Sequence, residues 1–141
     1  MQIPTMRRLL SIAAILALFA ASPVAQSKDH DQSLTINIAE GCVSDVVAAD
    51  PSNCDPSSSC KKQDGCVCIK PDKHISWASS DGTNFTLTAK SGSGWPFKKC
   101  KDSRDGSMTC KVEKDAADGD YLYNIEIEGC EVYDPRIIIQ R

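Results

Sequence analysis

The eight cysteines are the residues whose chemistry is most easily read from this sequence. An even number of cysteines in a small exported domain is typical of a disulfide framework, so we expect up to four disulfides. About a hundred pairings are possible, which leaves the connectivity open. Cys100 and Cys110 flank the polar segment Lys101 to Thr109, and we expect a bridge there to staple a hairpin-like loop. The eight residues are Cys42, Cys54, Cys60, Cys66, Cys68, Cys100, Cys110 and Cys130.

Besides structural disulfides, the cysteines have two other conceivable roles. Cys66 and Cys68 would suit a redox-active thiol pair, but the sequence around them lacks the alternating strands and helices of a thioredoxin-like setting. A zinc site would use Cys54, Cys60, Cys66 and Cys68, yet their spacing lacks paired CxxC knuckles. We therefore expect half-cystines at these positions and predict no metal site.

A basic and aromatic segment is the candidate binding site. Trp95, Phe97, Lys98 and Lys99 lie next to one another, and Lys101 and Arg104 extend the positive charge. Exposed rings beside cationic side chains suit an acidic glycan, a membrane headgroup or a protein partner. The alternative is that this segment is an ordinary solvated loop without a binding role. We expect contact with an unknown protein or glycan.

The remaining reactive side chains form no recognisable catalytic set. Asp115, Asp118 and Asp120 do not have the spacing of an EF-hand and are typical turn formers. His74 is a lone imidazole beside an expected strand, and the carboxylates show no acid/base pair. We predict that the protein is not an enzyme and has no cofactor.

The N-terminal residues have the pattern of a signal peptide. Arg7 and Arg8 precede an apolar run from Leu9 to Ala21, which is too short for a transmembrane anchor. We expect a signal over residues 1–25, a flexible segment over 26–32, no stable membrane anchor after cleavage, and a periplasmic or secreted protein. Without both arginines, 14 Lys and Arg face 19 Asp and Glu, a net charge of −5 that argues against nucleic-acid binding.

Alternating apolar residues predict a single all-β domain over residues 33–141 with a cysteine-rich loop over 50–68. The clearest strand is Tyr121 to Glu128, where tyrosine and isoleucine occupy every second position. We expect it to be central, and Ile137 to Ile139 to be buried on both sides or to lie at the end of a sheet. The other expected strands are 33–39, 66–69, 74–78, 85–89 and 108–112.

Three local features complete the prediction. Ser44 to Asp50 favours a short helical turn. The Asp81-Gly82 turn predicts a hairpin between strands 74–78 and 85–89. The rings of Trp95 and Phe97 are expected to close one end of the core.

The second half of the chain resembles the cupredoxin-like fold. The residues that carry the resemblance are a turn that leads into an apolar strand with Trp77, the segment from Asp118 to Tyr123, and the closing segment from Asp134 to Ile139. The chain also resembles small exported bacterial proteins of unassigned function with a Pro-Phe segment and a terminal Asp-Pro-x-Ile-Ile-Ile stretch. The resemblance implies an antiparallel or mixed β-sandwich, cupredoxin-like or immunoglobulin-like, here stabilised by disulfides.

The ligands of a blue-copper site are missing from this sequence. Such a site needs two imidazoles, one thiolate and usually a weak axial methionine, but only His30 and His74 remain after the signal. We therefore expect a non-catalytic exported binding or structural module. The alternatives are a copper-handling or electron-transfer protein with unusual ligands such as His74 and Met108, and a small disulfide-rich inhibitor that uses the loop over 50–68.

Overall fold

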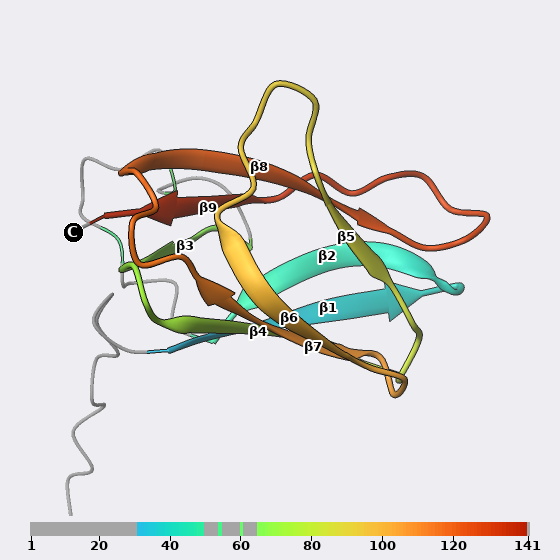
Figure 1. The fold of residues 1–141 in the computed structure, drawn as a ribbon. Helices are drawn as coiled ribbons and strands as arrows, with labels where there is room; N and C mark the ends of the chain where they lie inside the picture. Colours follow the sequence, from blue (N-terminus) through green and yellow to red (C-terminus); the bar gives the residue numbers. More distant parts are fainter. Residues whose placement is uncertain (1–30, 50–53, 55–59, 61–64, 141) are drawn as a thin grey trace, which may run out of the picture.

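The computed structural model describes residues 31–49, 54, 60 and 65–140, which form two stacked β-sheets (Figure 1). The five-stranded sheet has the order β2-β1-β4-β7-β6, and the four-stranded sheet has the order β3-β9-β8-β5. The strands are β1 (Gln32–Ala39), β2 (Cys42–Ala48), β3 (Val67–Ile69), β4 (His74–Ser79), β5 (Thr86–Ala89), β6 (Phe97–Ser103), β7 (Ser107–Val112), β8 (Gly119–Glu126) and β9 (Arg136–Ile139).

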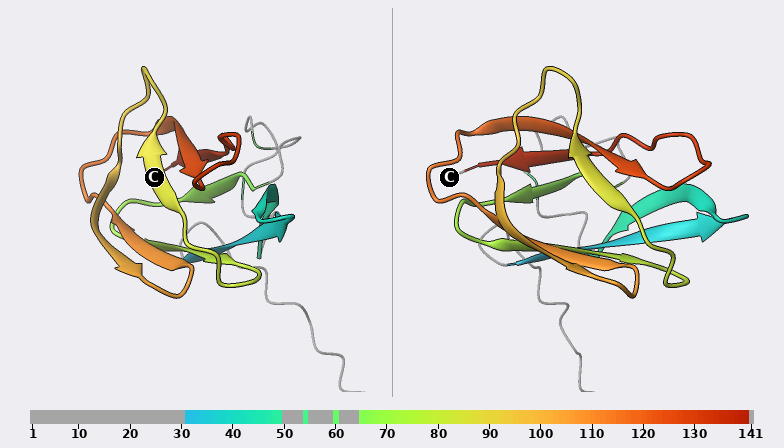
Figure 2. Two further views of the ribbon diagram at one scale, coloured as in Figure 1. Left: turned by 90° about the vertical axis from the view of Figure 1, so that its right-hand side faces the viewer. Right: turned by 45° about the vertical axis from the view of Figure 1, so that its right-hand side comes forward.

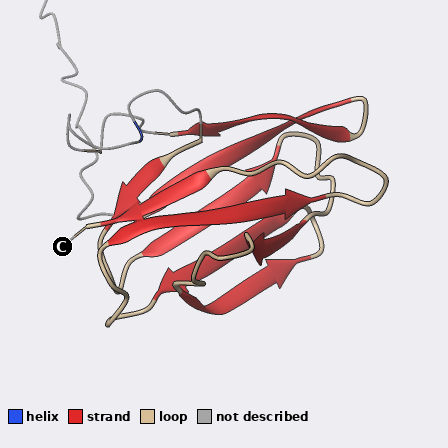
Figure 3. Ribbon diagram, turned by 90° about the horizontal axis from the view of Figure 1, so that it is seen from above, coloured by secondary structure: helices blue, strands red, loops and turns tan. Residues whose placement is uncertain are grey.

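The expected all-β sandwich is confirmed. β1 pairs with β4 and β3 pairs with β9 in parallel, whereas the other strand pairs are antiparallel, so both sheets are mixed. Figure 2 shows the two layers from two further directions, with the orange strand β8 and the red strand β9 on one side and the cyan strand β1 on the other. Within the described ranges the strands are joined by loops and turns (Figure 3), and no helix there is long and apolar enough to cross a membrane.

The core lies between the sheets and is centred on Trp77. Its indole is fully buried and makes edge contacts with the rings of Phe97 and Tyr123, at centroid distances of 5.7 and 5.8 Å. The indole Nε1–H of Trp77 donates a hydrogen bond of 2.9 Å to Oη of Tyr123. Burial raises the pKa of Tyr123 well above its usual value, so its hydroxyl is neutral. This bond therefore joins the two sheets without a buried charge.

Replacing Tyr123 by Phe is expected to lower the free energy of unfolding by about 1–3 kcal/mol, because the Trp77 N–H would lose its acceptor in a dry core. Urea unfolding followed by tryptophan fluorescence measures the loss. Tyr121→Phe is the control, since the Tyr121 hydroxyl donates to the carbonyl of Ala117 near the surface. Equal stability of the Tyr123→Phe protein and wild type would contradict the structural role of this bond.

The strand expected to be central is an inner strand of its sheet. Tyr123 and Ile125 of β8 are 1% and 0% exposed, which confirms the alternation. β9 lies between β3 and β8 and is buried on both faces. Ile137 and Ile139 join the main core, whereas Ile138 packs on the outer face with cysteines of the Cys-rich segment. Burial on both faces explains why Ile137 to Ile139 are all β-branched residues.

Three local predictions were wrong. Residues 44–48 belong to β2 rather than to a helical turn, because Val46 and Ala48 alternate inward and the strand pairs with β1. Strands β4 and β5 form no hairpin, since β4 pairs with β1 and β7 while β5 pairs with β8 in the other sheet. Gln32, placed in the flexible segment 26–32, is 2% exposed and begins β1 opposite Ile75. The signal peptide over 1–25 and residues 26–30 lie outside the described residues.

All eight cysteines are paired, as expected. The disulfides are Cys42–Cys130, Cys54–Cys68, Cys60–Cys66 and Cys100–Cys110. The predicted Cys100–Cys110 bridge is confirmed, and it joins β6 to β7 within their hairpin. Most of the predicted loop over 50–68 lies outside the described residues, so the inhibitor alternative stays a prediction.

Candidate binding groove

Basic side chains from three strands meet on the outer face of the five-stranded sheet. His74 of β4 lies opposite Lys111 of β7, and Lys111 lies opposite Lys98 of β6. Lys111 points outward because its neighbours Cys110 and Val112 are fully buried. Since directly opposite residues share a face of a sheet, the topology gathers these basic side chains at one end of that face.

A β-bulge in β6 adds more positive charge to the same face. The register shifts between Lys98 and Lys101, and Lys99 has a positive φ of 52°. Residues three apart in a regular strand face opposite ways, but the extra residue of a bulge brings them to one side. Lys98 and Lys101 consequently lie opposite Lys111 and Thr109, which are two residues apart. The Cys100–Cys110 disulfide ties the two strands together at this point.

This face carries an open groove with a volume of about 450 Å³. Its wall also carries the Thr109 hydroxyl, which lies 3.0 Å from the Ser76 hydroxyl. Backbone spacing between neighbouring strands is about 4.8 Å, so flexible lysine side chains from β6 and β7 can reach one ligand group together. The lining residues are His74, Lys99, Lys101, Thr109 and Lys111.

Acidic partners occupy only part of the groove. The amine of Lys111 lies 2.7 Å from the carboxylate of Asp72, and Asp31 lies 3.5 Å from His74 Nδ1. The hydrogen bond and charge of Lys111 lower the pKa of Asp72, with smaller effects from Lys98 and Lys114. Among the described residues, no carboxylate forms an ion pair with Lys99 or Lys101. Two cationic groups of the groove are therefore exposed to a ligand.

Comparison with known proteins gives a fold likeness only. No protein-family model matches the chain, and no curated protein matches it. Among solved structures, an oxidized mutant of amicyanin is similar with 11% sequence identity and a TM-score of 0.38, over 75% of this chain and 80% of that one.

The structure changes the predicted contact set. Phe97 is 5% exposed and packs against Trp77, so its ring belongs to the core and is no contact residue. The segment is also not a loop, because residues 97–103 form β6. Trp95 is 37% exposed and contacts Phe97 edge-on, while Lys98 is half-buried and Lys99 is exposed. Trp95, Lys98 and Lys99 remain candidates.

The basic residues expected to act together divide into two places. Lys99 and Lys101 line the groove, but Arg104 lies beside Glu126 and Glu128 in a separate hollow of about 310 Å³ at the far end of the hairpin. Sequence reasoning missed Lys111 and Thr109. Their two-residue spacing in the expected strand 108–112 indicated that they share one face of the sheet. Which residues of the adjacent strands lie beside them depends on the strand pairing, which the sequence did not reveal.

The proposed copper ligands do not meet. His74 points outward on β4, whereas Met108 lies opposite the inward-facing Trp77 and packs against the core. The two side chains are therefore on opposite faces of one sheet, which rules out a shared ion on this geometry. Among the expected turn residues, Asp120 pairs with Arg136 at 3.1 Å.

Proposed function

We propose that this chain is a non-catalytic binding module that binds an acidic glycan in the groove. The observation that carries the proposal is the convergence of His74, Lys99, Lys101 and Lys111 on one sheet face, in a chain whose formal net charge is −3. Such local positive charge attracts sulfate or carboxylate groups, while the acidic remainder disfavours general binding to nucleic acid.

A glycan suits this surface better than a compact anion. The lysines follow two adjacent strands, β6 and β7, so they can meet negative groups repeated along a polymer. The hydroxyls of Ser76 and Thr109 add hydrogen-bonding groups beside the lysines. Trp95, two residues before β6, offers an exposed ring close to the start of this strand. Four disulfides favour an exported location for the module.

The test is a calorimetric titration of the oxidised protein with dextran sulfate and with neutral dextran of equal length. Dextran sulfate is expected to bind, with an affinity that falls as sodium chloride increases, because the contacts are ionic. Neutral dextran is expected to give no heat of binding. Equal binding of the two polymers, or binding to anionic lipid vesicles without binding to dextran sulfate, would refute the glycan proposal.

Asp72→Asn is expected to raise the affinity for dextran sulfate about 2- to 5-fold, because Lys111 would lose its competing carboxylate. Asn keeps the turn, since it tolerates the positive φ of 68° at this position. Asp120→Asn is the matched control: it removes a surface ion pair to Arg136 from the other sheet. Equal gains from both variants would show an effect of net charge rather than of the groove.

A further inference from the structure

Two disulfides cover the outer face of β3 and β9. Cys66 and Cys68 are separated only by Val67, so both point to the outer side of the sheet, while Val67 and Ile69 enter the main core. Cys68 lies opposite Ile138 in the parallel register, and these side chains form a small apolar cluster with Cys60. The Cys54–Cys68 and Cys60–Cys66 bridges thus share one patch of surface.

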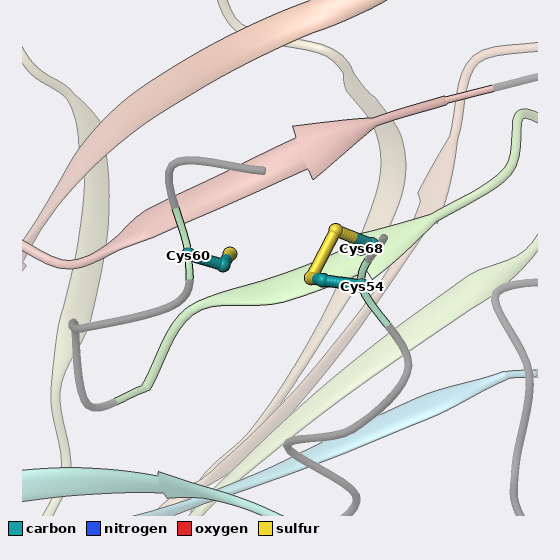
Figure 4. A group of neighbouring side chains, drawn as sticks. All are labelled: Cys54, Cys60 and Cys68. Atoms are coloured by element: carbon teal, nitrogen blue, oxygen red, sulfur yellow. A yellow bond between two sulfur atoms is a disulfide. The ribbon is translucent and has the colours of Figure 1, made fainter. Parts of the chain in front are cut away.

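The sulfurs of these two disulfides lie against each other. The Sγ atoms of Cys54, Cys60 and Cys68 are all within 4.8 Å of one another. Figure 4 shows the Cys60 sulfur turned toward the bonded Cys54 and Cys68 pair. A thiolate formed on one of the pairs therefore has a second disulfide within reach of a side-chain rotation. We infer that the four cysteines form a thiol–disulfide exchange site that reacts with a dithiol.

The exposure of the cysteines sets the order of attack. Cys54 is half-buried, whereas Cys60, Cys66 and Cys68 are 9%, 4% and 0% exposed. An external thiolate therefore reaches the Cys54 sulfur first and displaces the Cys68 thiolate. The Cys68 thiolate formed in this step lies within 4.8 Å of the Cys60 sulfur, and its attack there transfers the negative charge to Cys66.

The reaction consumes one dithiol and balances in atoms and electrons. The first thiolate of the dithiol bonds to Cys54, the Cys54–Cys68 bond breaks, and the Cys68 thiolate bonds to Cys60 as the Cys60–Cys66 bond breaks. The second thiol of the dithiol then displaces Cys54. The dithiol leaves as its disulfide, and its two protons end on the thiols of Cys54 and Cys66. The new Cys60–Cys68 bond moves the covalent anchor on β3 from Cys54 to Cys60.

The test maps the cysteines after limited reduction of the folded, oxidised protein with one equivalent of dithiothreitol. N-ethylmaleimide then traps free thiols. Cleavage before Asp55 and after Lys62 separates Cys54, Cys60 and the Cys66–Cys68 peptide for mass spectrometry. A variant in which Cys100 and Cys110 are both serine is run in parallel, because the exposed Cys100 offers the reductant another target. The expected product carries label on Cys54 and Cys66 and a Cys60–Cys68 linkage.

Three labelling patterns would overturn the inference: label on Cys54 and Cys68 with Cys60–Cys66 intact, label on all four cysteines, or reduction of Cys42–Cys130 before either pair.

A second variant tests the exchange without added reductant. Cys66→Ser leaves a thiol at Cys60, which is expected to displace Cys54 or Cys68, so that label appears on the displaced cysteine. Label confined to Cys60 would also overturn the inference. In the control Cys130→Ser, label is expected to stay on Cys42.

Discussion

Reversing two charges of the groove, as Lys99→Glu together with Lys101→Glu, is expected to weaken binding of dextran sulfate roughly 30-fold or more. Each exposed ionic contact contributes about 0.5–1 kcal/mol, and reversal replaces that attraction with a repulsion of similar size. Both side chains are exposed, and neither forms an ion pair with a described residue. The fold is therefore expected to tolerate both changes, with an unaltered unfolding midpoint.

The control for this prediction reverses the same number of charges elsewhere. Lys90→Glu with Arg104→Glu gives the same net charge, but Lys90 pairs with Asp134 and Arg104 lies in the separate hollow near Glu126. This protein is expected to bind dextran sulfate with at most a few-fold change in affinity. A similar loss in both double variants would show that overall charge, not the groove, determines binding. Calorimetry at one fixed salt concentration measures both.

Most of the strands that the sequence alone predicted have one face toward the core and one toward solvent, and the short apolar runs at β3 and β9, which are buried on both faces, were also predicted. In β1 and β8 the apolar residues occupy alternate positions, because one side meets the core and the other meets solvent. β6 was not predicted, because this lysine-rich edge strand has a bulge that breaks the alternation of inward and outward residues between Lys98 and Lys101. A polar edge strand of this kind lacks the two-residue alternation of apolar and polar residues from which a strand is predicted.

The groove was only partly predictable for a different reason. Lys99 and Lys101 were recognised as part of a basic segment, but His74 and Lys111 join them only because β4 pairs with β7. The turn at Asp81-Gly82 predicted that β4 would pair with β5 instead. In the structure this connection crosses to the other sheet, where Phe85 and Leu87 enter the same core from the opposite side. Strand order, not local sequence, therefore sets the composition of the site.

Removing the Cys42–Cys130 disulfide, with both residues changed to Ala, is expected to lower the free energy of unfolding by about 4–5 kcal/mol. The bridge closes a loop with a sequence separation of 88 residues. Breaking it returns more conformational freedom to the unfolded chain than breaking a short loop does. Cys42 begins β2 in one sheet and Cys130 follows β8 of the other, so the bond also ties the two layers together. Guanidinium unfolding measures the loss.

The Cys100–Cys110 pair supplies the matched comparison, because it closes a loop with a sequence separation of only 10 residues within one hairpin. Changing both of its cysteines to Ala is expected to lower the free energy of unfolding by about 3 kcal/mol, less than the loss for Cys42 and Cys130. The difference between the two double variants isolates the effect of loop length, since each removes one bond and leaves no free thiol. A larger loss from the hairpin pair would mean that local strand contacts, rather than the entropy of the unfolded chain, dominate the stabilisation.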